Sequence, residues 1–247
     1  MPRLLLLSNS RNPGEGYLSH ALGAIGAFLG PEPKRLAFVP YAAVTVSYAD
    51  YTARVRQALE PLGHMIESLH EGDPTEVLRE ANGLLVGGGN TFRLLEQLHH
   101  TDLLKRLRHK AMHGAPYIGW SAGANLACPT IRTTNDMPVV QPPSFAGLHL
   151  VPFQINPHYT DQVLPNHGGE SRDDRIQEFL ALNPGITVLG LREGSWLRVE
   201  QAGVELHGPR DMRVFRSGEA PLDVPPGSVA GSFRERKPPQ RVSGGFR

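Results

Sequence analysis

The chain has 247 residues, of which 40% are hydrophobic and 20% charged, an ordinary composition for a globular protein with a sizeable core. Its formal net charge of +1 gives neither the basic field of a nucleic-acid-binding protein nor a polybasic membrane anchor. The single cysteine, Cys128, excludes an intrachain disulfide and a cysteine-based zinc site, and the leucine run at residues 4–7 is too short for a signal peptide or membrane span. We therefore expect a cytoplasmic protein without a nucleic-acid or membrane partner.

The first half of the chain alternates short apolar runs with the spacing of amphipathic helices. Continuous apolar runs predict buried strands at residues 3–8, 35–39, 65–69 and 83–86, with a fifth ending just before Ser121. Apolar residues at steps of three and four predict helices at residues 18–29, 47–62, 74–80, 91–98 and 101–112. At the third helix, Asp73 is expected to cap the first turn, with Glu76 reaching back to it. This alternation predicts an α/β fold, a three-layer sandwich with a mostly parallel sheet flanked by helices.

The second half of the chain is less regular. Four prolines interrupt residues 129–147, which cannot form a regular helix, and long irregular loops of this kind are usually functional. After this loop the pattern predicts a strand at 148–155, a helix around 176–180, a strand at 187–191 and a C-terminal β-hairpin at 196–206. We expect a single catalytic domain over residues 1–234, followed by a Pro/Gly/Arg-rich tail at 235–247.

The fifth predicted strand runs into a G-x-S-x-G sequence that is typical of a nucleophile elbow. Ser121 stands at the apex of this turn, between two glycines and directly before a helix. The free amides of that helix, beginning with Ala122, point to where a carbonyl oxygen becomes negative during attack. A second glycine-rich loop, residues 87–90, also joins a strand to a helix and can bring further backbone donors. These features make Ser121 a candidate nucleophile.

A serine nucleophile needs a base, and histidine held by a carboxylate is the usual one. The chain has eleven histidines, of which His158 is set apart because it follows a buried strand and a rigid Asn-Pro pair. Two acids are candidates for orienting it: Asp136 in the proline-broken loop, and Glu193 in the corner between a strand and the hairpin. The residue pattern alone does not choose between these two carboxylates.

Three runs, at residues 87–92, 119–138 and 154–158, together resemble the peptidase E family of α-aspartyl dipeptidases, and the resemblance extends from residue 4 to about 215. It implies a serine peptidase with a class I glutamine amidotransferase-like fold, which cleaves small peptides with an N-terminal aspartate and needs no metal or cofactor. Position by position it implies the following roles: Ser121 as nucleophile, His158 as base, Asp136 as acid with Glu193 as the alternative, and the amides of Gly89 and Ala122 as the oxyanion hole. Glutamine amidotransferases of this fold use a cysteine at the elbow, whereas Cys128 lies seven residues later and is expected to pack in the core.

The resemblance also implies a residue that binds the side-chain carboxylate of the substrate aspartate. Arg172, in the polar segment 168–175, matches the arginine that binds the substrate carboxylate, with Arg132 as a reserve candidate. The alternative for Arg172 is a surface ion pair with a neighbouring aspartate. Asn90 and Thr91, in the run after the glycines, are further candidates for substrate binding.

Three other functions stay open on the sequence alone. They are a cyanophycinase-like β-aspartyl peptidase, an esterase that uses the same elbow, and a binding protein with an inert triad. The sequence does not decide between a monomer and a homodimer.

Overall fold

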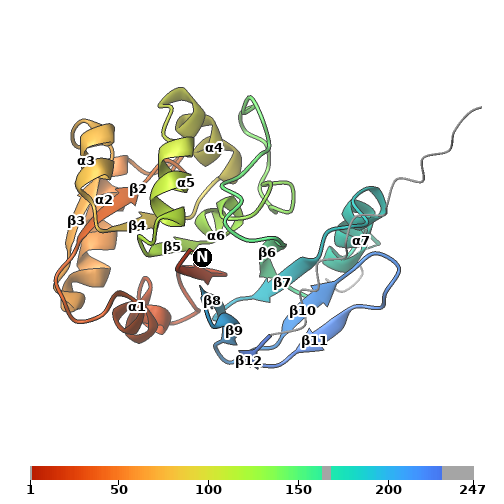
Figure 1. The fold of residues 1–247 in the computed structure, drawn as a ribbon. Coiled ribbons are helices and arrows are strands. Elements are labelled where there is room, and N and C mark those ends of the chain that lie inside the picture. Colours follow the sequence, from red (N-terminus) through yellow and green to blue (C-terminus); the bar gives the residue numbers. More distant parts are fainter. Residues whose placement is uncertain (1, 163–167, 230–247) are drawn as a thin grey trace, which may run out of the picture.

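The protein, in a computed structural model that describes residues 2–162 and 168–229, is an α/β structure with two sheets (Figure 1). The larger sheet has the strand order β12-β9-β8-β1-β5-β4-β2-β3. Its parallel part consists of β1 (Leu4–Leu7), β5 (Tyr117–Trp120), β4 (Gly83–Val86), β2 (Arg35–Val39) and β3 (Met65–Ser68). Antiparallel pairing extends it through β8 (Trp196–Glu200), β9 (Gly203–His207) and β12 (Gly227–Ser228).

Helices cover both faces of this sheet because its strands are apolar on both faces. Along β1, Leu4 and Leu6 belong to one buried cluster and Leu5 and Leu7 to another, as the two-residue period of a strand requires. The first cluster packs against α3 (Pro74–Glu80), α4 (Thr91–His100), α5 (Leu104–Met112) and α6 (Ala122–Leu126). The second packs against α1 (Leu22–Leu29) and α2 (Tyr48–Leu59), each joined to a short 3₁₀ turn, Ser19–Ala21 or Glu60–Leu62. The predicted three-layer sandwich is confirmed.

The starts of α3 and α5 each differ in one respect from expectation. Asp73 accepts a hydrogen bond from the Thr75 amide (2.8 Å), but Glu76 forms an ion pair with Arg79 (2.5 Å) instead of reaching back. The helix expected from residue 101 begins only at Leu104, because the Thr101 amide closes the preceding helix by donating to the Gln97 carbonyl.

The second sheet, beside the first in Figure 1, has the order β11-β10-β7-β6, of which sequence patterns indicated only part. Its strands are β6 (Gln154–Tyr159), β7 (Val188–Arg192), β10 (Met212–Phe215) and β11 (Leu222–Val224), and α7 (Arg172–Leu182) packs on it. The strand expected at 148–155 begins at Gln154, because the amides of Leu148 and Leu150 bond to carbonyls at the end of α6 and Pro152 has no amide to donate. Strands β10 and β11 were not anticipated.

The loop at residues 129–147 contains no helix or strand, as expected from its prolines, and only a single bridge links Thr130 to Ala146. The tail expected at 235–247 lies outside the described residues. Within 2–162 and 168–229, no helix has the length and apolar character needed to cross a membrane.

Candidate active site

Ser121 occupies a strained turn between β5 and α6, with φ 53° and ψ −111°. Backbone angles of this kind are costly for a residue with a side chain and persist only where the surroundings impose them. Here the Ser121 amide donates to the Leu7 carbonyl (3.0 Å), which fixes the turn to β1. The flanking glycines are required, because a Cβ on Gly119 would lie 2.4 Å from the Gly123 oxygen and a Cβ on Gly123 2.1 Å from the Val86 oxygen. The predicted elbow is therefore built by close packing around the serine.

His158 is also strained, with φ 53°, and lies where the pairing of β6 with β7 shifts register between Asn156 and Tyr159. A buried serine, Ser8, fixes this position. The Ser8 hydroxyl accepts a hydrogen bond from the His158 amide (2.9 Å) and donates to the Leu191 carbonyl (2.7 Å). One side chain at the end of β1 thus joins the two sheets at the imidazole, a role that the sequence analysis missed.

A continuous chain of hydrogen bonds links Ser121 to a carboxylate through His158. Nε2 of His158 is 2.9 Å from Oγ of Ser121, and Nδ1 is 2.7 Å from Oε1 of Glu193. Because a carboxylate only accepts, Nδ1 carries the proton, which leaves Nε2 of the neutral imidazole to accept from the serine hydroxyl. This is the protonation state in which His158 can remove the serine proton.

Glu193 owes its position to the corner where β7 of the second sheet continues into β8 of the first. At this corner the Gly194 amide donates to Oδ1 of Asn9 (2.8 Å), and Gly194 has a φ of 81°, which favours glycine. The side chains of His158 and Glu193 remain 41% and 48% exposed, and the imidazole is accessible to a substrate.

Asp136, which the resemblance places in the acid role, is bonded elsewhere. Its Oδ2 accepts hydrogen bonds from the amide (2.7 Å) and hydroxyl (2.6 Å) of Thr91 and from the Thr134 hydroxyl (3.0 Å). Thr91 is the first residue of α4, so the carboxylate caps the positive end of that helix. The structure therefore brings Glu193, and not Asp136, to the imidazole.

Ser121 and His158 line a pocket of about 620 Å³, within the usual range for small-molecule sites. The glycine-rich loop forms part of its wall, because a Cβ on Gly88 would be 3.0 Å from that of Ser121. Among the described residues, the Gly89 amide has no backbone partner, and the Ala122 amide lies in the first helical turn, where no intrahelical carbonyl is available. Both amides are free to donate to an oxyanion.

Three aromatic residues, Tyr17, Tyr51 and Trp120, support the glycine-rich loop. Nε1 of Trp120 donates to the hydroxyls of Tyr17 (2.9 Å) and Tyr51 (3.1 Å), and the Tyr51 hydroxyl donates to the Gly88 carbonyl (3.0 Å). Burial raises the pKa of both tyrosines, which keeps them neutral donors. The network holds the loop beside Ser121.

Arg172 has no carboxylate partner among the described residues, so the alternative of a surface ion pair is not observed. Asp173 bonds to Tyr159 and Arg213, and Asp174 is held in a capping box by Ser171. The guanidinium of Arg172 donates to Oδ1 of Asn135 (2.5 Å), whose amide donates to the Pro157 carbonyl beside His158. Burial lowers the pKa of Arg172, with a smaller effect of Arg175, but Arg172 is not among the residues that line the pocket.

The other substrate-binding candidates are engaged in structural contacts. Arg132 points to α7, where it donates to Asn183 (3.0 Å) and lies over the Phe179 ring, and it does not line the pocket. Thr91 is buried and bonded to Asp136. Asn90 lines the pocket, but its side chain caps α4 and donates to the Met137 carbonyl (2.8 Å). An arginine that was not predicted, Arg54 of α2, lines the pocket with Ser121.

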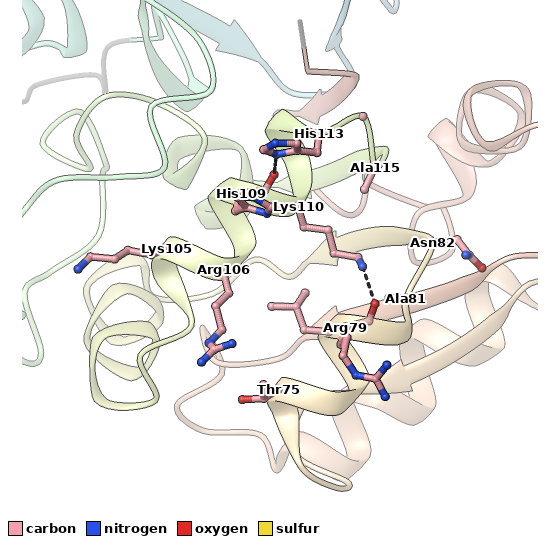
Figure 2. Close-up of a pocket in the computed structure, with 12 residues that line it drawn as sticks. Thr75, Arg79, Ala81, Asn82, Lys105, Arg106, His109, Lys110, His113 and Ala115 are labelled. Carbon is pink, nitrogen blue, oxygen red and sulfur yellow. Dashed lines mark hydrogen bonds between the residues drawn. The ribbon is translucent and has the colours of Figure 1, made fainter.

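A larger hollow of about 900 Å³ lies between α3 and α5, away from Ser121 (Figure 2). Basic side chains surround it, and His109 and His113 stack with ring centroids 3.9 Å apart. Neither serine nor cysteine lines it, and Lys110 donates to the Arg79 carbonyl (3.0 Å). The smaller pocket, whose lining includes both the nucleophile Ser121 and the base His158, is therefore the candidate active site.

Within the described residues, no cluster of three or more His, Cys, Asp or Glu side chains could hold a metal ion.

Cys128 is buried in the core, and its Sγ accepts a hydrogen bond from the Ile155 amide (3.2 Å). Burial raises the pKa of this thiol to about 12, so the reactive thiolate is nearly absent at neutral pH. Iodoacetamide at pH 8 is therefore expected to leave both Cys128 and hydrolytic activity unchanged, as checked by intact mass and by rate. Inactivation in proportion to alkylation of Cys128 would contradict this prediction.

The fold and the site together define an α/β protein with a strand–helix elbow and a serine–histidine–carboxylate chain of the kind used in acyl transfer. The profile of Peptidase family S51 matches residues 4–207. The chain therefore belongs to peptidase family S51, and it is a peptidase by family.

Curated relatives agree with this assignment, and a solved structure has a similar fold. The chain is 54% identical to Peptidase E of Streptomyces coelicolor, over 91% of this chain and 92% of that protein, and 51% identical to Peptidase E of Nostoc sp., over 88% and 90%. It is 48% identical to Peptidase E of Escherichia coli K12, over 90% and 97%. The fold is similar to that of a putative peptidase E protein from Listeria monocytogenes EGD-e, with a TM-score of 0.65 and 24% identity over 85% of this chain and 99% of that chain.

Proposed function

We propose that the protein is a serine dipeptidase that hydrolyses dipeptides with an N-terminal aspartate through an acyl-enzyme on Ser121. The observation that carries this proposal is the chain of two hydrogen bonds from Ser121 through His158 to Glu193. The relatives named Peptidase E support the peptidase assignment.

In this mechanism, His158 removes the serine proton through Nε2 as Oγ attacks the carbonyl carbon of the first residue. The negative oxygen of the tetrahedral intermediate accepts hydrogen bonds from the amides of Gly89 and Ala122. His158 then returns its proton to the leaving amine, and a water molecule repeats the sequence on the acyl-enzyme. The Glu193 carboxylate accepts the hydrogen bond from Nδ1–H of His158, which orients the imidazole and stabilises the transient imidazolium.

The substrate aspartate needs a cation, because a carboxylate buried without a partner costs several kcal/mol. Arg172 is our candidate, since its guanidinium is half-buried and has no carboxylate partner within residues 2–162 and 168–229.

Asp136 lines the pocket, and the three hydrogen bonds that its carboxylate accepts all go to Oδ2, which leaves Oδ1 without a partner among the described residues. We propose that Oδ1 of Asp136 receives the substrate's α-ammonium group.

A substrate panel tests the function directly. We expect rapid cleavage of Asp-Leu and little of Leu-Asp, β-Asp-Leu, N-acetyl-Asp-Leu or a simple ester. Preference for β-Asp-Leu would instead indicate a cyanophycinase-like enzyme, and activity on the ester alone would indicate an esterase. If none of the five compounds is turned over, the proposed function is rejected in favour of an inert triad.

Replacing Arg172 with methionine is expected to reduce kcat/KM for Asp-Leu by roughly 100-fold, equivalent to about 3 kcal/mol. The neutral substrate Asn-Leu should change little, because it has no side-chain carboxylate for the arginine to bind. Arg132→Met is the matched control and should leave both substrates unaffected, since Arg132 contacts α7. An equal loss on Asp-Leu and Asn-Leu would mean that Arg172 supports the fold instead of reading the aspartate.

A further inference from the structure

A dipeptide with an N-terminal aspartate carries two carboxylates, and the structure offers a separate arginine for the second. The first carboxylate is the aspartate side chain and the second is the C-terminus. The C-terminal carboxylate is present in every such dipeptide, whereas a longer peptide has a peptide bond at that position. The titratable side chains that line the described pocket are Arg54, Asp136, His158 and the two tyrosines Tyr17 and Tyr51, which stay neutral because burial raises their pKa. Arg54 is therefore the cation of this pocket, since His158 acts as a neutral base.

The position of Arg54 follows from its place on α2. Tyr51 and Arg54 are three residues apart on this helix and project to the same side, so both line the pocket. The guanidinium lies 5.9 Å from the centre of the Tyr17 ring. Tyr17 is itself held by hydrogen bonds to Tyr51 and Trp120. The aromatic network that supports the glycine loop thus also provides a surface on which Arg54 rests.

Arg54 has no carboxylate within ion-pair distance among the described residues, unlike its neighbour Arg56, which pairs with Glu71 (2.6 Å). Its side chain is exposed, whereas that of Arg172 is half-buried. The less exposed Arg172 is suited to bind the aspartate side chain of the substrate, which the enzyme must distinguish from close analogues such as asparagine. The exposed Arg54 is suited to bind the C-terminal carboxylate at the solvent-facing end of the substrate, where solvent screens part of the electrostatic attraction.

We propose that Arg54 binds the C-terminal carboxylate of the dipeptide and so favours substrates of two residues. This inference rests on the proposed function. A guanidinium can hold a carboxylate through two parallel hydrogen bonds, which fixes orientation as well as charge. In a tripeptide the same position is occupied by a neutral amide, which forms no ion pair, and the additional residue extends beyond it.

The experiment compares Asp-Leu with Asp-Leu-amide, which differ only in the C-terminal charge. We expect the wild-type protein to prefer Asp-Leu by about tenfold in kcat/KM, a value reduced from that of a buried pair by the exposure of Arg54. Arg54→Met should lower kcat/KM for Asp-Leu by the same factor and leave Asp-Leu-amide within about twofold. Arg54→Lys should recover part of the preference, because it restores the charge without the planar fork.

Arg106→Met is the matched control, since Arg106 is an exposed arginine of α5 at the distant hollow (Figure 2). It should change neither substrate. Equal cleavage of acid and amide by the wild-type protein, or an equal loss on both in Arg54→Met, would overturn the inference and leave the proposed function intact. Loss of the preference for Asp-Leu over Asn-Leu in Arg54→Met would also overturn it, because Arg54 would then read the side chain. Failure of the wild-type protein to cleave any of these peptides would reject the proposed function itself.

Discussion

Replacing Ser121 with alanine is expected to reduce kcat for Asp-Leu by roughly 10⁶-fold, to the residual level that binding and oxyanion stabilisation alone provide. Alanine lacks only the hydroxyl that His158 activates. It meets the same backbone strain at φ 53° as serine, and the flanking contacts of Gly119 and Gly123 stay as they are. The thermal midpoint should therefore change by no more than about 3 °C.

Steady-state rates and thermal melting of the two proteins, prepared in parallel, measure these two effects. Ser144→Ala is a matched control, because Ser144 is an exposed serine in the loop at 129–147 whose hydroxyl only accepts a bond from the Ala146 amide. It should retain full activity. If Ser121→Ala keeps more than about a tenth of the wild-type rate, free of wild-type contamination, the serine mechanism is rejected.

Local sequence patterns were sufficient to predict the strands, a helix cap and the elbow, because these features depend on neighbouring residues in the chain. The strands at Arg35–Val39 and Gly83–Val86 lie where continuous apolar runs placed them, and Asp73 caps the helix that begins at Pro74. The elbow was predictable because only glycine can stand where a Cβ would meet a carbonyl at 2.1–2.4 Å.

Contacts between distant segments were not predictable in the same way. Ser8 joins His158 to Leu191 across separations of 150 and 183 residues, and no periodicity in the sequence reports such a contact. The second sheet was only partly anticipated because β10 and β11 are short and follow a region rich in turn residues. Arg54 was passed over because an exposed arginine on an amphipathic helix is ordinarily a solvated residue.

The choice between Asp136 and Glu193 depends on this long-range geometry. Asp136 lies in the proline-broken loop and Glu193 directly follows β7, and the resemblance favoured Asp136. The hydrogen bonds differ: Glu193 reaches His158 at 2.7 Å from the corner between the sheets, whereas Asp136 is bonded to the first turn of α4. Because the two sets of contacts are separate, substitution of each acid should give a different kinetic result.

Glu193→Gln is expected to lower kcat for Asp-Leu by roughly 10⁴-fold, because the amide no longer fixes the Nδ1–H tautomer or stabilises the imidazolium. KM should change little, since in this mechanism Glu193 does not touch the substrate. The thermal midpoint should also be nearly unchanged, because the Glu193 side chain is 48% exposed and bonded only to His158 among the described residues.

Asp136→Asn is expected to act differently, raising KM and lowering the thermal midpoint by a few degrees while kcat falls far less than in Glu193→Gln. The carboxylate accepts from the amide and hydroxyl of Thr91 at the start of α4, and asparagine keeps an acceptor oxygen but loses the negative charge that interacts with the helix dipole, an interaction of about 0.3–1 kcal/mol. In the proposed pocket, the same change removes the negative charge that receives the α-ammonium group. Rates over a range of Asp-Leu concentrations, with melting curves of both variants, separate these effects. A larger loss of kcat in Asp136→Asn than in Glu193→Gln would mean that Asp136 orients His158 during turnover, and near-full activity in both would remove both acids from the triad.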